Sequence, residues 1–381
     1  MLKQVSKALT HFNYMSDILK KYVCISPFRY LDIQSTSQHI CCPAWCPSNI
    51  REDNNNNITW SPVTSEEDLS KNWNSKEIQA VRESVLDGSY KYCNHKVCPS
   101  LSSLINTGEP TSILIEKSKF EKEFNIRSLE DIKNYQGLPE EIVFGFDRSC
   151  NLKCPSCRDD LVPNDDVDSA EHNRKLILLR KIEESFASGL KKMLITGSGD
   201  PFYSKIYRDY LINFNEELYP NLENIQIITN GILLNEKMWM SLKAKKYIKV
   251  IEISIDAGNK DTYENVTRLN GDWDKLIENI KFLSTQTSIQ HMTFSMVVSQ
   301  YNYKEMIQLY NVIDDIFKIS QVGFDIHYRQ LVRWPSGKYS IKEVSDISVF
   351  DRSHPLFNDF ILELKKLTNL EKVNHNFHHL L

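Results

Sequence analysis

The sequence predicts an α/β protein, because six β-rich runs alternate with helical segments from about residue 141 onward. The runs are short, rich in Ile and Val and bounded by turn residues; they cover 141–147, 192–199, 224–231, 248–256, 291–298 and 321–331. Helical patterns separate them, at about 173–189, 207–218, 235–245, 273–286 and 303–318. Right-handed connections place such strands side by side in parallel. We therefore expect a parallel sheet, buried on both faces, that curls into a barrel or stays open.

The first 125 residues differ in character from this repeating region. They contain short β-like runs, a helical stretch at 73–89 that ends near a glycine, and most of the cysteines of the chain. We therefore expect three parts: a small cysteine-rich domain at 1–125, the domain of β-α units at 138–340, and a carboxy-terminal helix and tail at 341–381.

The composition excludes several classes of protein. Apolar residues make up 41% of the chain and charged residues 25%, which excludes a disordered or fibrous protein. The formal net charge of −4 argues against a strongly basic nucleic-acid-binding protein. No apolar run is long enough to span a bilayer, and the first residues lack the features of a secretory signal. We therefore expect a cytoplasmic protein that binds neither nucleic acid nor membrane.

Nine cysteines in such a protein need an explanation, because a reducing compartment seldom uses disulfides for structure. An odd number also cannot all pair with one another. They form an amino-terminal group and a tight cluster, namely Cys24, Cys41, Cys42, Cys46, Cys93 and Cys98, and then Cys150, Cys154 and Cys157. Both groups lie beside turn-forming residues instead of being scattered through helices and strands. Metal or cluster binding is the better interpretation of both.

The tight cluster has the spacing C-x3-C-x2-C and follows the first predicted strand of the repeating region. Three thiolates on one short loop can bind three irons of a [4Fe–4S] cluster and leave the fourth iron open. The alternatives are a three-ligand zinc site and three unrelated thiols. A zinc site would more naturally show paired C-x2-C units or nearby His ligands.

With this motif the chain resembles the radical S-adenosylmethionine superfamily, in which the same three cysteines follow the first strand. The resemblance covers about 138–331 and implies a partial (β/α)6 TIM-type barrel. Polar residues at successive strand ends support it, since barrels build their active sites there. One departure is Ser156, where the family usually has an aromatic residue, so the packing of adenine would differ at that point.

The resemblance implies a set of contacts to S-adenosylmethionine. The turn Ser198-Gly199-Asp200-Pro201, with Asp in place of a family Glu, would receive the methionyl amino group. Ser254 and Asp256 would contact the ribose and carboxylate, and Arg268 would pair with the methionyl carboxylate. The residues that close the fifth strand would contact adenine and ribose; these are Val298, Gln300 and Asn302.

The amino-terminal cysteines resemble the auxiliary-cluster region called a SPASM or twitch domain, although that region usually follows the barrel. The segments CCPAW, WNS and YC-x4-CP carry the resemblance. It implies a second [4Fe–4S] cluster whose ligands would be Cys24, one of Cys41 or Cys42, Cys93 and Cys98. A structural zinc site is the alternative. Cys46 could be a buried thiol, a cluster ligand or a donor of a hydrogen atom to a substrate radical.

The resemblance implies that the open iron binds S-adenosylmethionine, which is cleaved reductively to a 5′-deoxyadenosyl radical that abstracts a hydrogen from a substrate. The expected substrate is a ribosomally made peptide or a protein, which would be cross-linked, oxidised or epimerised. A sugar or other small molecule is the alternative substrate, and a non-catalytic iron–sulfur electron carrier is the alternative class. The expected electron donor is a flavodoxin or ferredoxin. Asp325 and His327, on one face of the last predicted strand, could contact the substrate or simply pack outward.

Overall fold

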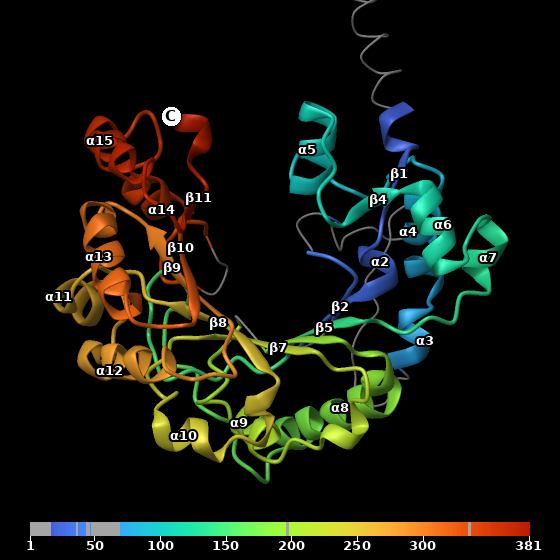
Figure 1. Ribbon diagram of the computed structural model, residues 1–381, viewed down its shortest axis with the longest axis horizontal. Helices are drawn as coiled ribbons and strands as arrows, with labels where there is room; N and C mark the ends of the chain where they lie inside the picture. Colours follow the sequence, from blue (N-terminus) through green and yellow to red (C-terminus); the bar gives the residue numbers. More distant parts are fainter. Residues whose placement is uncertain (1–16, 36, 43–45, 47–68, 196–197, 334–336) are drawn as a thin grey trace, which may run out of the picture. The chain divides into compact units, whose positions relative to one another are not determined.

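The computed structural model describes residues 17–35, 37–42, 46, 69–195, 198–333 and 337–381 (Figure 1). The chain divides into two compact units. The first comprises residues up to Phe146 together with Arg174–Lys192 and Leu218–Asn221, and the second comprises Asp147–Asn173, Met193–Glu217 and Leu222–Leu381. None of the described helices is both long and apolar enough to cross a membrane.

The second unit is built on parallel strands. Its strands run in the order β7, β8, β9, β10 and β11, with the bounds Asn224–Thr229, Ile248–Ser254, His291–Val298, Gly323–Gln330 and Val373–His375. Each neighbouring pair in this series is parallel. Strand β6 (Lys192–Ile195) lies beside β7. The predicted α/β class, with a partial TIM-type barrel, is confirmed.

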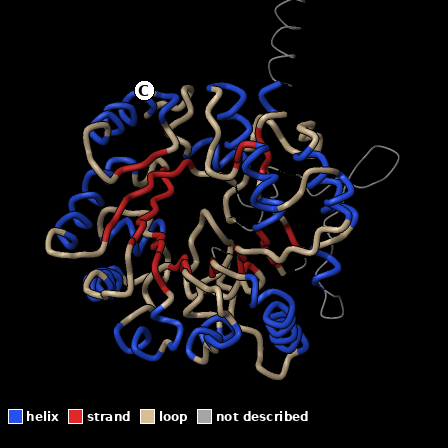
Figure 2. The backbone as a smooth tube through the Cα atoms, turned by 45° about the vertical axis from the view of Figure 1, so that its right-hand side comes forward, coloured by secondary structure: helices blue, strands red, loops and turns tan. Residues whose placement is uncertain are grey.

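Helices connect the strands and lie on their outer side (Figure 2). They are α9, α10, α12, α13, α14 and α15, with the bounds Lys205–Ile212, Glu236–Ser241, Trp273–Leu283, Met306–Phe317, Ile341–Ile347 and Phe357–Leu367. Helix α12 shows how they form: the Asp272 side chain caps its amino end by accepting from the backbone N–H of Lys275. Its apolar residues Leu276, Ile280 and Leu283 then share one buried face.

One face of this sheet differs from the sequence prediction. Along β8, Ile251 and Ile253 are buried, whereas the alternating residues Val250, Glu252 and Ser254 are only half-buried. Since side chains alternate between faces, this pattern gives one apolar face and one accessible face. The expectation that both faces would be fully buried is therefore wrong for β8, and the accessible face remains open to a ligand.

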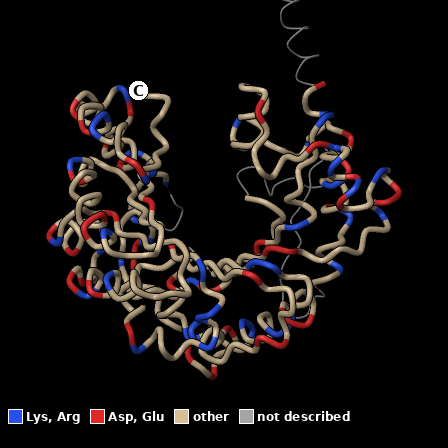
Figure 3. Tube along the Cα trace, in the orientation of Figure 1, with Lys and Arg blue, Asp and Glu red and all other residues tan. Residues whose placement is uncertain are grey.

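The first unit contains two small groups of strands. Strand β2 (Tyr30–Gln34) pairs in parallel with β5 (Glu141–Gly145) and antiparallel with β3 (Gln38–His39). Strand β1 (Tyr22–Cys24) pairs antiparallel with β4 (Leu114–Glu116). The main helices of this unit are α4, α5, α6 and most of α8, with the bounds Lys76–Leu86, Pro99–Thr107, Lys117–Phe124 and Ala170–Phe186. Acidic and basic residues are interspersed along the described chain, in keeping with its small net charge (Figure 3).

A fully buried cation, Arg82 of α4, lies at the centre of the first unit's packing. Its guanidinium carbon lies 4.6 Å from the ring centroid of Trp73, 4.9 Å from that of Tyr135 and 5.7 Å from that of Phe28. Nε donates to the carbonyl of Pro27 at 2.9 Å. Burial lowers the pKa of Arg82 to about 10, which leaves it charged at neutral pH. Aromatic faces and a carbonyl thus replace the water that a surface arginine would keep.

We expect Arg82→Ala to lower the free energy of unfolding by roughly 3 kcal/mol, because it leaves a cavity and unpaired carbonyl groups. The measurement is the thermal unfolding midpoint followed by circular dichroism. Arg127→Ala, which removes an exposed arginine from the same unit, is the matched control and should change stability by less than about 0.5 kcal/mol. Equal effects of the two substitutions would contradict a stabilising role for the aromatic cage.

Candidate active site

The three cysteines of the C-x3-C-x2-C motif line one pocket of about 150 Å³ in the second unit. The loop that carries them is closed by a backbone bridge between Cys150 and Val162. It turns tightly, since the carbonyl of Cys154 accepts from the backbone N–H groups of Cys157 and Arg158. This folding brings the three cysteines to the lining of one pocket.

A nitrogen donor lies against each of the three sulfurs. Arg268 Nη1 lies 3.4 Å from Cys154 Sγ, and Arg158 Nη2 lies 3.4 Å from Cys157 Sγ. Asn230 Nδ2 lies 3.9 Å from Cys150 Sγ. Donors of this kind stabilise thiolate over thiol and tune an iron–sulfur cluster held by the thiolates.

Burial makes the thiols of Cys150 and Cys154 hard to ionise without a bound cation. It raises the pKa of Cys150 to about 11. Burial also raises the pKa of Cys154, although the positive charge of Arg268 partly opposes the increase. Metal ligation requires thiolates, and irons would supply the positive charge that stabilises them. No three His, Cys, Asp or Glu side chains in the described residues are grouped to hold a single metal ion.

The turn at 198–201 packs directly on the cysteine loop. A Cβ atom on Gly199 would lie 2.6 Å from the carbonyl oxygen of Ser149, so only glycine permits this approach. The carbonyl of Ser198 accepts from Arg158 Nη2 at 3.3 Å. Gly199 lines the pocket, and Ser198 holds the arginine that lies against Cys157.

Asp200 is buried next to this turn and is not among the residues that line the pocket. Its Oδ2 accepts from Thr229 Oγ1 at 2.7 Å and from the backbone N–H of Asn230 at 2.9 Å. Burial raises the pKa of Asp200, and these hydrogen bonds oppose the increase. The structure thus has Asp200 positioning Thr229 and Asn230, both of which line the pocket. Its contact with the methionyl amino group stays a prediction.

Ser254, Asp256 and Arg268 also line the pocket. Arg268 Nη2 lies 2.8 Å from Asp256 Oδ2, and both side chains are nearly buried. Asp256 Oδ1 also accepts from the backbone N–H of Val297 at 2.7 Å. Asp256 therefore orients Arg268 between its own carboxylate and the sulfur of Cys154.

The three residues predicted at the end of the fifth strand are not among those that line the pocket. Val298 is fully buried, whereas its neighbour Val297 lines the pocket. Asn302 Nδ2 donates to the carbonyls of Asp256 and Val297, at 2.8 and 2.9 Å. The backbone N–H of Gln300 donates to the carbonyl of Ile347. Asn302 thus supports the pocket-lining residues Asp256 and Val297, and the contacts of all three residues with adenine and ribose stay predictions.

Arg158 and Asn230 are the residues that sequence reasoning missed. Arg158 directly follows the third cysteine, and Asn230 follows β7 in the sequence Thr-Asn-Gly. The available signal was position, because polar residues at carboxyl ends of barrel strands face the active site.

The amino-terminal cysteines line a second pocket, which lies within the first unit. Its thiols come from the end of β1, the loop after β3, the connection between α4 and α5, and the residue before α5; they are Cys24, Cys41, Cys46, Cys93 and Cys98. Cys42, although described, is not among the lining residues. Cys46 is 1% exposed.

Three of these thiols, Cys24, Cys41 and Cys93, have a raised pKa to which neighbouring cysteines of the group contribute. Burial raises the pKa of Cys24 to about 11, and negative charge on Cys98 or Cys46 would raise it further. Burial likewise raises the pKa of Cys93, with added contributions from Cys46, Cys24 and Cys98. Such a group gains stability from a bound cation, and its donor set fits an iron–sulfur cluster.

Comparison with known proteins relates part of the chain to a known family. Residues 146–313 match the family model described as the Radical SAM superfamily. The chain is 30% identical over 168 residues to GTP 3′,8-cyclase of Clostridium perfringens, an alignment that covers 43% of this chain and 48% of the relative. The chain thus spans about half the length of that relative.

Two further relatives are more distant but align over more of the chain. The S-adenosylmethionine-dependent nucleotide dehydratase RSAD2 of Oncorhynchus mykiss is 23% identical, over 60% of this chain and 62% of the relative. The antilisterial bacteriocin subtilosin biosynthesis protein AlbA of Bacillus subtilis is 21% identical, over 82% of this chain and 59% of the relative. The family match and the three-thiol pocket agree: the chain carries a domain of the radical S-adenosylmethionine superfamily.

Proposed function

We propose that this protein is an enzyme that uses a [4Fe–4S] cluster and S-adenosylmethionine to modify a peptide or protein substrate. The observation that carries the proposal is that three cysteines line one pocket and that a nitrogen donor lies against each of their sulfurs. When bound, the cluster and S-adenosylmethionine supply one-electron chemistry that removes a hydrogen atom from a substrate.

The chain's own residues would bind and orient these groups. Cys150, Cys154 and Cys157 would hold three irons of the cluster. Arg158 and Arg268 would donate to the ligand sulfurs, as they do to the thiols in this structure. Asp256 keeps Arg268 in place. The apolar side chains of Ile228, Val297, Leu331 and Val332 line the same pocket and would limit access of water to it.

The choice of a peptide substrate is supported by the extent of the alignment with AlbA. That alignment covers 316 residues, whereas the one with GTP 3′,8-cyclase covers 168. AlbA is named for the biosynthesis of a bacteriocin, and a match of this length extends beyond the family model at 146–313. The higher identity to GTP 3′,8-cyclase favours the second candidate, a small nucleotide-like substrate.

We further propose that the first unit holds a second [4Fe–4S] cluster, with a flavodoxin or ferredoxin as the external electron donor. Cys24, Cys93 and Cys98 would be three of the ligands, and Cys41 or Cys46 would supply the fourth. The support is that all five thiols line one pocket while Cys42 does not. The structural zinc site is the competing proposal for this pocket.

The test is anaerobic reconstitution followed by incubation with S-adenosylmethionine and dithionite. We expect 5′-deoxyadenosine from the reconstituted protein and none from Cys154→Ala, because that variant loses one of three ligands to the cluster. Absence of 5′-deoxyadenosine from a fully reconstituted protein would favour the electron carrier. Transfer of deuterium into 5′-deoxyadenosine from labelled peptides, but not from labelled nucleotides, would assign the substrate class.

A further inference from the structure

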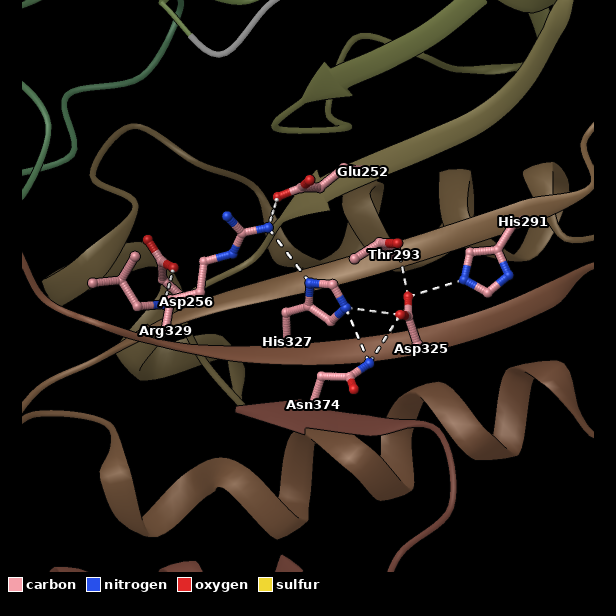
Figure 4. A network of polar contacts seen from close by, with 9 residues as sticks. Glu252, Asp256, His291, Thr293, Asp325, His327, Arg329 and Asn374 are labelled. Atoms are coloured by element: carbon pink, nitrogen blue, oxygen red, sulfur yellow. Dashed lines mark hydrogen bonds and ion pairs between the residues drawn. The ribbon is translucent and has the colours of Figure 1, made fainter. Parts of the chain in front are cut away.

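Three arginines lie in or beside the three-thiol pocket, and two of them have a carboxylate partner of their own. Arg158 and Arg268 line the pocket. Burial raises the pKa of Asp256, and the charge of the nearby Arg329 is among the influences that lower it. Arg268 Nη2 lies 2.8 Å from Asp256 Oδ2. Arg329 Nη2 lies 2.9 Å from Glu252 Oε1, and Figure 4 shows these two side chains reaching toward each other across β9. The positive charges of Arg268 and Arg329 are therefore compensated within the protein.

Arg158 is the exception among the three. It is only 5% exposed. Its Nη1 donates to the carbonyl of Arg148 at 3.1 Å. Its Nη2 donates to the carbonyl of Ser198 at 3.3 Å and to Cys157 Sγ at 3.4 Å. No Asp or Glu side chain of the described residues forms an ion pair with it. Arginine is seldom buried to this extent without a paired anion, because burying an uncompensated charge is costly.

One edge of the Arg158 guanidinium is only partly used. Nε shares this edge with Nη2, and the planar group can donate two parallel hydrogen bonds from it. Nε is buried and has no hydrogen-bond partner in the part of the chain that the structure describes. Nη2 lies against Cys157 Sγ, and Arg158 lines the pocket. An anionic atom next to the Cys157 sulfur would therefore complete this edge.

The charge of Arg158 acts on all three cysteines of the pocket. Burial alone would lower the pKa of Arg158, but negative charge on Cys150, Cys157 and Cys154 raises it, together with the hydrogen bond to Cys157. In return, the positive charge of Arg158 opposes the increase that burial causes in the pKa of Cys150. Opposite charges attract strongly in a buried site, where little water screens them. The thiolates of the pocket thus have Arg158 as their uncompensated counter-charge.

We propose that Arg158 is the counter-ion of the cluster held by these three cysteines and raises the reduction potential of that cluster. Reduction transfers one electron to the cluster from a reduced flavodoxin or ferredoxin, which is itself oxidised. The added negative charge is stabilised by an uncompensated positive charge beside it. Arg268 and Arg329 contribute less, because a carboxylate offsets the charge of each. The inference rests on the proposed function, since it takes the three cysteines as ligands of a cluster.

The test is an anaerobic redox titration of the reconstituted full chain without S-adenosylmethionine, followed by electron paramagnetic resonance. The signal that is missing in Cys154→Ala is assigned to the cluster of the three-thiol pocket. We expect Arg158→Gln to lower the equilibrium constant for reduction of this cluster at least tenfold, which moves the midpoint potential down by about 59 mV. Arg158→Lys keeps the positive charge and should retain most of the potential.

Lys153→Gln is the matched control for this titration. Lys153 belongs to the same loop, but it is 42% exposed and paired with Asp160, so water and a carboxylate already screen its charge. We expect this variant to change the equilibrium constant less than about twofold. Asp256→Asn tests the same reasoning in the opposite direction. It removes the carboxylate that compensates Arg268 and keeps Arg158, so the constant should rise several-fold.

Each other result has a defined meaning. An unchanged potential in Arg158→Gln, or an equal loss in Arg158→Lys, would overturn the inference, because the charge would then not set the potential. An unchanged or lower potential in Asp256→Asn would overturn it as well, and this result can be read even where Arg158→Gln assembles no cluster. The proposed function fails separately. It would be contradicted if Cys154→Ala kept every signal and all of its iron, and the inference would fall with it.

Discussion

Cys93→Ala is expected to lower the iron content of the anaerobically reconstituted protein by about four irons per chain, half of the total for two clusters. Cys93 lies in the five-thiol pocket, where thiolates at Cys46, Cys24 and Cys98 all affect its pKa. Loss of this ligand should leave the cluster of the second unit in place, because its three cysteines lie in a separate pocket. Iron and sulfide analysis together with electron paramagnetic resonance measures the result.

Cys42→Ala is the matched control for this experiment. Cys42 lies next to Cys41 but does not line the pocket, so we expect this variant to keep all of its iron. The second cluster would be contradicted if the unmodified protein held only about four irons per chain. It would also be contradicted if the five-thiol pocket bound zinc instead of iron. Comparison of Cys41→Ala with Cys46→Ala then identifies the fourth ligand. We expect it to be Cys46, which is almost fully buried and affects the pKa of both Cys24 and Cys93.

Arg268→Met is expected to lower the rate of reductive cleavage of S-adenosylmethionine by at least about 100-fold, since it removes a positioned donor from the pocket. It also leaves the nearly buried carboxylate of Asp256 without its cation, at a cost of roughly 3 kcal/mol in stability. The two effects are measured separately, by 5′-deoxyadenosine formation and by thermal unfolding of the protein before reconstitution.

The double variant Asp256→Asn, Arg268→Met separates stability from function. It removes the unpaired charge and should regain most of the stability, but it should not regain the cleavage rate. Burial already raises the pKa of Asp256 and Arg268 lowers it in part, so the pKa rises further in Arg268→Met. The destabilisation of that single variant should shrink as the pH falls through this raised pKa, because protonated Asp256 carries no buried charge. Wild-type cleavage by either variant would contradict the role given to Arg268.

The sequence predicted the barrel strands well because their apolar runs and turn residues are local signals. It did not predict that β2 pairs with β5, since a five-residue run at Tyr30–Gln34 carries no indication of its partner. The three-thiol loop was also predicted from a local signal, the C-x3-C-x2-C spacing. Arg158 and Asn230 were missed because their contacts with sulfur arise only when separate segments fold together.

Register explains another difference at the site. Val298 was the predicted contact, but its neighbour Val297 lines the pocket. A shift of one residue moves a strand side chain to the opposite face, and sequence patterns rarely fix a strand to one residue. Asp200 has the predicted carboxylate chemistry, yet its oxygens accept from Thr229 and Asn230. A carboxylate that lines the pocket can contact a ligand directly. One that is buried behind the lining, as Asp200 is, orients the residues that line the pocket instead.

The ladder of hydrogen bonds among β8, β9 and β10 has a consequence for the geometry of the three-thiol pocket. Arg329 and the pocket-lining Gln330 are adjacent on one strand, and Glu252 is two residues from Ser254 on another. Paired strands cannot slide against each other without breaking every bond of the ladder. The spacing of Glu252 and Arg329 from the pocket-lining residues Ser254 and Gln330 is therefore constant, so a substitution that shifts the register of either strand would displace a residue of the three-thiol pocket.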